Sequence, residues 1–133
     1  MKLSIFTDGG ARGNPGPAAI GVVIKEGKKT IKEYGCYIGE TTNNQAEYQA
    51  LISALESAKD LGAQEIDLNM DSELIVKQIK GEYKVKNADL APLFLKFYNL
   101  KIGLKKFTVR HIPREKNKEA DKLVNGALDE RGS

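Results

Sequence analysis

Residues 41–71 read TTNNQAEYQALISALESAKDLGAQEIDLNMD, and this stretch decides the fold. Its first part predicts a strong helix, because Thr42 or Asn43 can cap the start and Gln45 or Glu47 can complete a capping box. A glycine then ends the helix. The last part, EIDLNMD, alternates apolar and polar residues as a strand does. A helix that leads directly into a strand indicates an α/β protein.

The apolar stripe of this helix leads back to an acidic residue. The stripe consists of Ala50, Leu51, Ala54, Leu55, Ala58 and Leu61. Extending it by one turn toward the start of the helix reaches Glu47, so we expect this carboxylate to point inward. Glu47 also fits the far half of a capping box with Asn44, which is an equally good explanation when the residue is considered alone. A carboxylate on a core-facing stripe otherwise needs a partner.

The rest of the chain alternates strands and helices. Strands are predicted at 2–8, 18–25, 29–39, 65–71 and 104–112, and helices at 41–63, 72–81, 88–102 and from about 117 onward. The segment GGARGNPGP after the first strand is too rich in glycine and proline for helix or strand, and the short EGKK connection favours a hairpin. This order predicts an α/β fold with a five-stranded mixed sheet, its first three strands antiparallel, and helices on both faces. Cys36, in the third strand, is expected to pack inward.

Composition indicates one soluble domain over residues 1–133. Lys plus Arg is 21 and Asp plus Glu is 18, and the net charge of +3 permits nucleic-acid contact without demanding it. One cysteine and one histidine exclude an intramolecular disulfide and a structural zinc site, which favours a cytoplasmic setting. The apolar run at residues 3–6 is too short for a signal peptide or a membrane span.

Four carboxylates, on Asp8, Glu47, Asp71 and Asp121, are expected at one rim of the sheet. Asp8 and Asp71 end two strands that can lie parallel and adjacent, and Glu47 and Asp121 lie near helix starts. Gathered carboxylates repel one another unless cations lie between them. Oxygen ligands suit Mg²⁺ or Mn²⁺, and a pair of such ions can drive phosphodiester hydrolysis without a separate nucleophile. His111, at the end of the last strand, is expected at the same rim.

Taken singly, these residues have simpler explanations. A strand-terminal Asp8 or Asp71 is commonly a turn or cap acceptor, and Asp121 can complement the positive end of its helix. His111 alone fits a polar residue beside Arg110. The functional hypothesis therefore depends on the joint placement of the acidic residues.

Four segments, TDGGARGNPG, TTNNQAEYQAL, MDSELIVKQIKG and HIPREKNKEAD, resemble the signature segments of type 1 ribonuclease H, in order and over nearly the whole chain. The resemblance implies the ribonuclease H-like fold and an endonuclease that hydrolyses the RNA strand of RNA/DNA hybrids. It further implies two Mg²⁺ ions, with Mn²⁺ as a substitute, and products that end in 3′-hydroxyl and 5′-phosphate groups. The short GEYKVKN link stands where bacterial relatives insert a lysine-rich handle, so the chain is similar to the handle-less, archaeal-like subgroup.

The resemblance also assigns site residues by motif position. Asp8, Glu47, Asp71 and Asp121 match the metal-binding carboxylates, and His111 matches a residue that assists proton transfer or product departure. Recognition of RNA requires groups that meet 2′-hydroxyls in the minor groove. Residues expected to bind substrate are Gly9, Gly10, Ala11, Asn14, Thr42, Asn43, Asn44, Gln45 and Glu73. Thr42 matches part of the pocket for a DNA phosphate, and Glu73 stands where many relatives carry glutamine.

Three rival hypotheses fit the sequence less well. A non-catalytic nucleic-acid-binding module of this fold predicts loss of a carboxylate, and none is lost. A dinucleotide-binding enzyme requires G-x-G-x-x-G before a helix, which the loop with its two prolines does not provide. A junction resolvase of the wider superfamily is disfavoured by the TTNNQAE and HIPREKN segments. The sequence leaves open whether double-stranded RNA or RNA-DNA junctions are also cut, and a monomer is expected.

Overall fold

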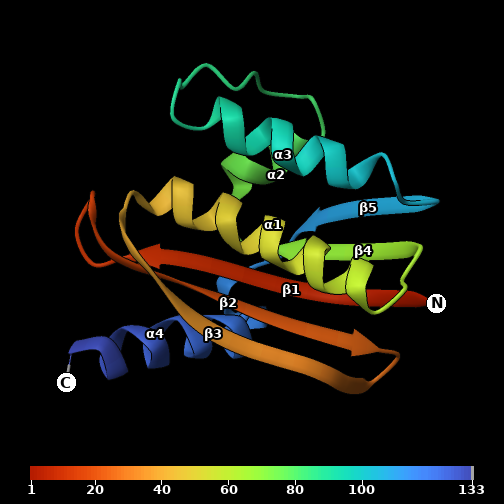
Figure 1. Ribbon diagram of the computed structural model, residues 1–133, viewed down its shortest axis with the longest axis horizontal. Helices are drawn as coiled ribbons and strands as arrows, with labels where there is room; N and C mark the ends of the chain where they lie inside the picture. The colour runs from red at the N-terminus through yellow and green to blue at the C-terminus, as the bar shows by residue number, and fades with distance from the viewer. Residues whose placement is uncertain (133) are drawn as a thin grey trace.

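The computed structural model describes the backbone of residues 1–132 and the side chains of residues 1–131. The strands are β1 (Lys2–Ala11), β2 (Gly16–Glu26), β3 (Lys29–Thr41), β4 (Glu65–Met70) and β5 (Lys106–His111). The helices are α1 (Asn43–Asp60), α2 (Glu73–Ile79), α3 (Ala91–Lys101) and α4 (Lys118–Gly132), with a 3₁₀ turn at Arg114–Lys116. This element order matches the prediction (Figure 1).

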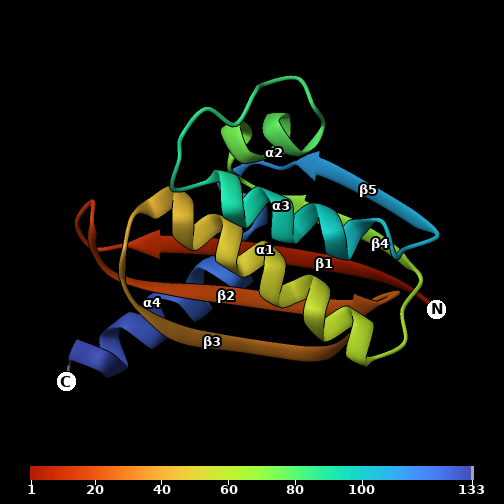
Figure 2. The same cartoon turned by 45° about the horizontal axis from the view of Figure 1, so that its top comes forward.

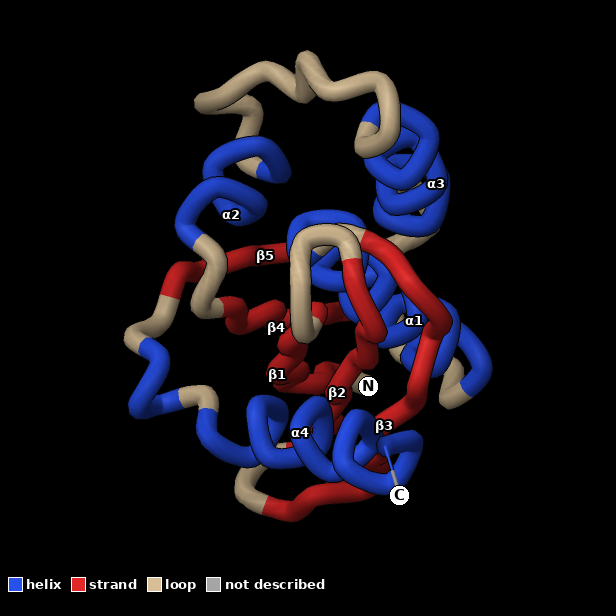
Figure 3. Tube along the Cα trace, turned by 90° about the vertical axis from the view of Figure 1, so that its left-hand side faces the viewer, coloured by secondary structure: helices blue, strands red, loops and turns tan. Residues whose placement is uncertain are grey.

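The five strands form one mixed sheet in the order β3-β2-β1-β4-β5. The pairs β1–β2 and β2–β3 are antiparallel, and the pairs β1–β4 and β4–β5 are parallel. Helices α1, α2 and α3 lie on one side of the sheet and α4 lies alone on the other (Figures 1 and 3). The predicted mixed sheet, with helices on both faces, is confirmed.

The loop predicted at residues 9–17 is mostly strand, so that prediction was wrong. β1 continues to Ala11 and β2 begins at Gly16, because the backbone of Gly9, Gly10 and Ala11 pairs with that of β2. Ladder hydrogen bonds need no side chain, and a composition rule that equates glycine with a loop misses them.

Helix α1 begins at a complete capping box. The Thr42 side chain accepts a hydrogen bond from the Gln45 N–H, and the Gln45 side chain in turn accepts from the Thr42 N–H. Of the two candidate caps, Thr42 holds the position, and of the two candidate box partners, Gln45 completes it. Glu47 is therefore not needed as a capping residue.

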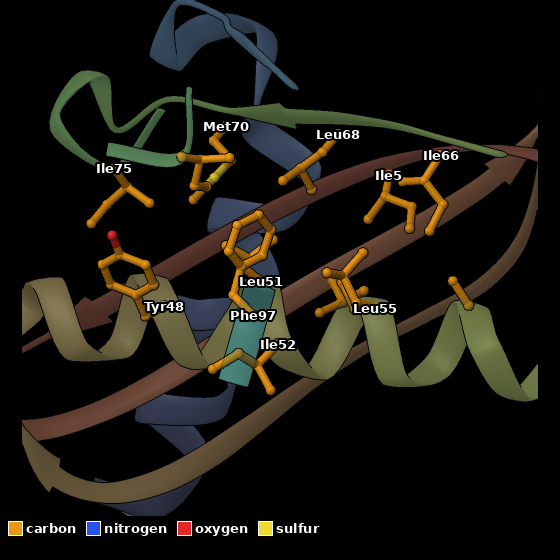
Figure 4. Close-up of a cluster of buried hydrophobic side chains, with 14 of the residues drawn as sticks. Ile5, Tyr48, Leu51, Ile52, Leu55, Ile66, Leu68, Met70, Ile75 and Phe97 are labelled. Atoms are coloured by element: carbon orange, nitrogen blue, oxygen red, sulfur yellow. The ribbon is translucent and has the colours of Figure 1, made fainter. Parts of the chain in front are cut away.

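The main core lies between α1 and the sheet. Figure 4 shows Ile5 of β1 and Leu68 of β4 facing Leu51 and Leu55 of α1, with Phe97 of α3 over them. Helix α3 lies alongside α1 (Figure 2), and the ring centroid of its Phe97 lies 5.6 Å from that of Phe107 in β5. The core thus fixes α1 against β1 along most of its length.

Cys36 is exposed, in contrast to the expected inward packing. It lies on β3, an edge strand in which no residue is fully buried. Alternation of apolar and polar residues does not distinguish an edge strand from a central one. Within the described chain, no helix is both long and apolar enough to cross a membrane.

Glycines without room for a side chain let both helix layers approach the central strands. A Cβ at Gly9 of β1 would lie 2.3 Å from the backbone carbon of Ala46 in α1. A Cβ at Gly21 of β2 would lie 2.2 Å from the carbonyl oxygen of Ala120 in α4. Each contact precedes a predicted metal-binding acid by one residue in the helix, so the glycines set where those acids lie.

Candidate active site

Asp8 and Asp71 lie side by side because β1 and β4 are parallel neighbours. The register pairs Thr7 with Met70, and the next residue of each strand is one of the two acids. The predicted adjacency of these strands is confirmed, although Asp8 does not end its strand. The carboxyl ends of adjacent parallel strands are where sites form in α/β proteins.

Glu47 reaches the same point from the helix that packs on β1. Its Oε1 accepts a hydrogen bond of 2.7 Å from the N–H of Gly9, the residue after Asp8. One carboxylate oxygen from each of Asp8, Glu47 and Asp71 lies within 4.8 Å of the others. Glu47 is 4% exposed and Asp8 is 8% exposed, so this cluster is largely buried.

Asp121 joins the cluster from the opposite face of the sheet. Gly21 pairs with Asp8 across β1 and β2, and it is the residue against which Ala120 packs. The first turn of α4 therefore brings Asp121 close to Asp8. The Asp121 side chain is 32% exposed, and its Oδ1 lies 3.7 Å from the Arg114 guanidinium.

Crowding and burial change the titration of the two inner acids. Burial, followed by the charges of Asp71 and Asp121, raises the pKa of Asp8 from 3.8 to about 7. Burial and the charges of Asp8 and Asp71 raise the pKa of Glu47 well above its usual range. Both acids therefore resist ionisation unless a cation is close. An all-oxygen donor set of this kind fits hard divalent cations such as Mg²⁺ or Mn²⁺.

The acidic cluster lies in the wall of a cavity of about 430 Å³. Its lining includes all four predicted metal-binding acids together with Gly9, Gly10, Ala11 and Asn43 from the predicted substrate set. Two arginines, Arg12 and Arg114, also line it, and Arg12 is ion-paired with Asp129 at 2.6 Å. The cavity thus combines a negative floor with positive charge at its edge, as a site for a metal-bound phosphate requires.

His111 does not line this cavity. It is exposed at the end of β5, and its charge acts on Glu73, whose pKa is lowered mainly by the hydrogen bond and charge of Lys77. Arg114 lies at the cavity instead, and it was not among the site residues predicted from the sequence. The sequence feature that could have indicated Arg114 is its position between Pro113 and Asp121, in the segment that leads into α4.

All the predicted substrate residues except Glu73 line one of two cavities. Asn14, Thr42, Asn43, Asn44 and Gln45 line a second cavity of about 160 Å³, together with Asn87, Asp89 and Leu90 from the segment before α3. Asn43 accepts from the Ala11 N–H, and its own N–H donates to Asn14, so it joins the two cavities. Glu73 lies in neither lining and pairs with Lys77 at 2.8 Å.

Two substrate predictions change in detail. The N–H of Gly9 donates to Glu47 and that of Ala11 donates to Asn43. These two N–H groups therefore hold side chains of the site in place and are not free to donate to a substrate. Asn87 and Asp89 also line the second cavity and were not among the predicted residues, and Asp89 fell within the helix predicted at 88–102, which begins instead at Ala91. Their only sequence signal was the polar composition of the link before α3.

Asn117, between the 3₁₀ turn and α4, was also missed. It is 1% exposed, and its Nδ2 donates to the Thr7 carbonyl at 2.9 Å and to Asp71 Oδ2 at 3.2 Å. From the sequence it marks only the start of the last helix. Its position four residues before Asp121 was the available signal.

Known proteins share both sequence and fold with this chain. A family model described as reverse transcriptase-like matches residues 6–127. The chain is 44% identical to ribonuclease HI of Halobacterium salinarum over 97% of its own length, and it spans 65% of that protein. It is 32% identical to ribonuclease H of Methylococcus capsulatus, with 94% of this chain and 88% of that protein covered.

A solved structure extends the likeness to three dimensions. The crystal structure of LC11-RNase H1 in complex with an RNA/DNA hybrid matches with a TM-score of 0.94 and 51% identity, covering 98% of this chain and 99% of that one. The likeness thus extends over the sheet, both helix layers and the segments that carry the four acids. The chain belongs to the type 1 ribonuclease H family.

Proposed function

We propose that this protein hydrolyses the RNA strand of RNA/DNA hybrids with two divalent metal ions, Mg²⁺ or Mn²⁺. The observation that carries the proposal is the meeting of three acids within 4.8 Å, with a fourth at the mouth of the same cavity. Membership of the ribonuclease H family supports the reaction class, and the hybrid bound to LC11-RNase H1 supports the substrate class. Products ending in 3′-hydroxyl and 5′-phosphate groups follow from the same proposal.

Each acid has its own place in this proposal. Asp8 and Glu47 form the buried base of the metal site, and Asp71 and Asp121 complete it from the open side. When bound, the two ions supply an activated water and stabilise the departing oxygen of the phosphodiester. Arg114 attracts the phosphate backbone to the cavity, and His111 assists product departure from the exposed end of β5.

The two cavities divide the substrate between them. The RNA strand lies over the acidic cavity, where Gly10 and Ala11 bring the backbone close to the sugar edge. The DNA strand passes the smaller cavity, where hydroxyl and amide groups of Thr42, Asn14 and Asn44 can donate to a phosphate. Asn43 borders both cavities and thereby sets their spacing. We propose that the chain acts as one cytoplasmic domain and as a monomer.

A direct test uses a labelled RNA/DNA duplex with Mg²⁺, with Mn²⁺ and with a chelator. We expect cleavage of the RNA strand with either metal and none with the chelator. Asp8→Asn should abolish it, and Asp60→Asn, at the exposed end of α1, should leave it unchanged. Cleavage products should accept a 5′ label only after phosphatase treatment.

Two outcomes contradict the proposal. One is an intact hybrid with both metals, and the other is an Asp8→Asn variant that cuts as fast as the wild type. Parallel reactions with double-stranded RNA and with an RNA-DNA junction define the substrate range. A protein that cuts only those two substrates would refute the hybrid assignment while retaining the metal mechanism.

A further inference from the structure

Asn117 connects the separate parts of the acidic cluster. It is 1% exposed and follows the 3₁₀ turn Arg114–Lys116 directly. Its side-chain Nδ2 donates to two oxygens at once, the carbonyl of Thr7 at 2.9 Å and Oδ2 of Asp71 at 3.2 Å. Thr7 immediately precedes Asp8 on β1. A single amide group therefore ties Asp71 to the strand that carries Asp8.

The main chain of the same residue fixes two more groups. Its carbonyl accepts from the N–H of Asp121 at 3.1 Å, which starts α4, and its N–H donates to the carbonyl of Arg114 at 3.0 Å. Rotation of the α4 start would move Asp121 and Asn117 together. The geometry of three acids and of Arg114 thus depends on one buried residue.

The surroundings of the amide determine its orientation. If the amide were turned over, its oxygen would face the two oxygens of Thr7 and Asp71, and both contacts would become repulsive. In the orientation observed, the Asn117 Oδ1 atom is buried without a hydrogen-bond partner within the described part of the chain. A buried amide that leaves its own oxygen unpaired contributes poorly to folding stability, because that oxygen has lost its water. In return for the unpaired oxygen, the amide makes its hydrogen bond to Asp71.

We propose that Asn117 is a positioning residue for the metal site. By holding Oδ2 of Asp71, it fixes the plane of that carboxylate within the cluster that Asp71 forms with Asp8 and Glu47. This inference rests on the proposed metal-dependent function. It assigns to Asn117 an effect on metal affinity, which a purely structural link between α4 and β1 would not have. Groups that orient metal ligands commonly change affinity by about 10- to 100-fold when they are removed.

Asn69 provides a matched control within the same sheet. It is 6% exposed, and its Nδ2 donates to the β1 carbonyl of Ile5 at 3.1 Å, as Asn117 does to that of Thr7. The acceptor of this hydrogen bond is a backbone carbonyl and not a carboxylate. Asn69→Ala therefore removes a buried amide that holds the same strand without releasing an acid. The two variants separate lost stability from lost positioning.

The experiment measures Mn²⁺ binding by titration calorimetry and the rise in melting temperature on Mn²⁺ addition, without substrate. Asn117→Ala and Asn117→Leu, the second of which keeps the side-chain volume, are compared with Asn69→Ala and the wild type. We expect the affinity of both Asn117 variants for Mn²⁺ to be lower than that of the wild type by about tenfold or more. Asn69→Ala should melt at a lower temperature but bind Mn²⁺ within about twofold of the wild type. Cleavage by the Asn117 variants should recover as Mg²⁺ is raised.

The possible failures are distinguishable. If a folded Asn117 variant binds Mn²⁺ as tightly as the wild type, or if Asn69→Ala weakens binding as much, the positioning role is wrong. A wild-type protein that binds no Mn²⁺ would instead overturn the proposed function. If Asn117→Ala does not fold, Asn117→Leu still decides the question, because it leaves no void at the site.

Discussion

The inner and outer halves of the acidic cluster differ in almost every physical respect. Asp8 and Glu47 are nearly inaccessible to solvent, and the pKa of each is raised. Asp71 and Asp121 are only partly buried and have donors beside them, from the Asn117 amide and the Arg114 guanidinium respectively. Ionisation of the inner half is therefore unfavourable without a cation, whereas each outer acid already has an amide or a guanidinium beside it.

The difference shows how one sheet can build a cation site. The inner acids are held by backbone contacts at Gly9 and by the core, so they cannot turn toward water to relieve their repulsion. The outer acids lie at the open side of the cavity, and their positions depend on the segment before α4. The inner half is therefore held by the main chain and the core, and the outer half by the side chains of Asn117 and Arg114. Three experiments test this comparison.

The largest effect is expected from neutralising the inner half in the absence of metal. The pKa of Asp8 is raised in the folded state, so the folded protein binds the proton more tightly and loses stability as pH rises from about 4 to about 7. A displacement from 3.8 to about 7 corresponds to about 4 kcal/mol, shared with the neighbouring acids. With a chelator at pH 8, Asp8→Asn should therefore unfold at higher denaturant than the wild type.

The outer half supplies the control for this measurement. Asp121→Asn should stabilise the protein less than Asp8→Asn does under the same conditions, because burial contributes more to the raised pKa of Asp8 than the charge of Asp121 does. Below about pH 4 the wild type and Asp8→Asn should unfold together, because Asp8 is then protonated in both states. Equal denaturation curves for wild type and Asp8→Asn at pH 8 would remove the distinction between the two halves.

The second largest effect is expected from the two glycines that let α1 and α4 approach the sheet and so fix the positions of Glu47 and Asp121. A Cβ at Gly9 would lie 2.3 Å from the backbone of α1, and one at Gly21 would lie 2.2 Å from that of α4. Either alanine should cost about 3 kcal/mol or more by overpacking. Gly9→Ala should also reduce cleavage more than Gly21→Ala, because it displaces the buried Glu47, whereas Asp121 can readjust.

Gly126 is the matched control for these substitutions. It lies within α4, and a Cβ added there would meet nothing within 4 Å, so Gly126→Ala should stabilise the protein by about 0.5–1 kcal/mol. The free energy of unfolding, from denaturation curves, and the cleavage rate are measured for Gly9→Ala, Gly21→Ala and Gly126→Ala. If Gly21→Ala loses more activity than Gly9→Ala, cleavage depends more on the exact position of Asp121 than on that of Glu47, which contradicts the prediction.

The smallest effect separates the contributions of Arg114 and His111. Arg114 lines the cavity, and His111 lies outside it. Arg114→Ala should lower kcat/KM for a hybrid about tenfold, mainly through KM, with a weaker dependence on salt. His111→Ala should lower kcat by less than that and leave KM unchanged. A larger loss for His111→Ala than for Arg114→Ala would contradict the greater role assigned to Arg114.

Much of this site could be predicted because its signals are local. The stripe on α1 placed Glu47 inward, and the strand-helix-strand order made β1 and β4 parallel neighbours. What could not be predicted depends on contacts across the sheet. Neither the packing of Ala120 on Gly21 nor the reach of Asn117 to Asp71 leaves a periodic trace in the sequence. The strand formed by Gly9 and Gly10 was hidden by composition that usually indicates a turn.

The four acids come from four segments that span the chain from Asp8 to Asp121, and the last of them lies on the last helix. A polypeptide emerging from the ribosome therefore carries an incomplete site until α4 has been made and has docked on β2. Under the proposed function, cleavage therefore requires that this helix has been made and has docked on the sheet. Dividing the chain after residue 112 would separate Asn117 and Asp121 from the other three acids, so cleavage by the two fragments should require their association.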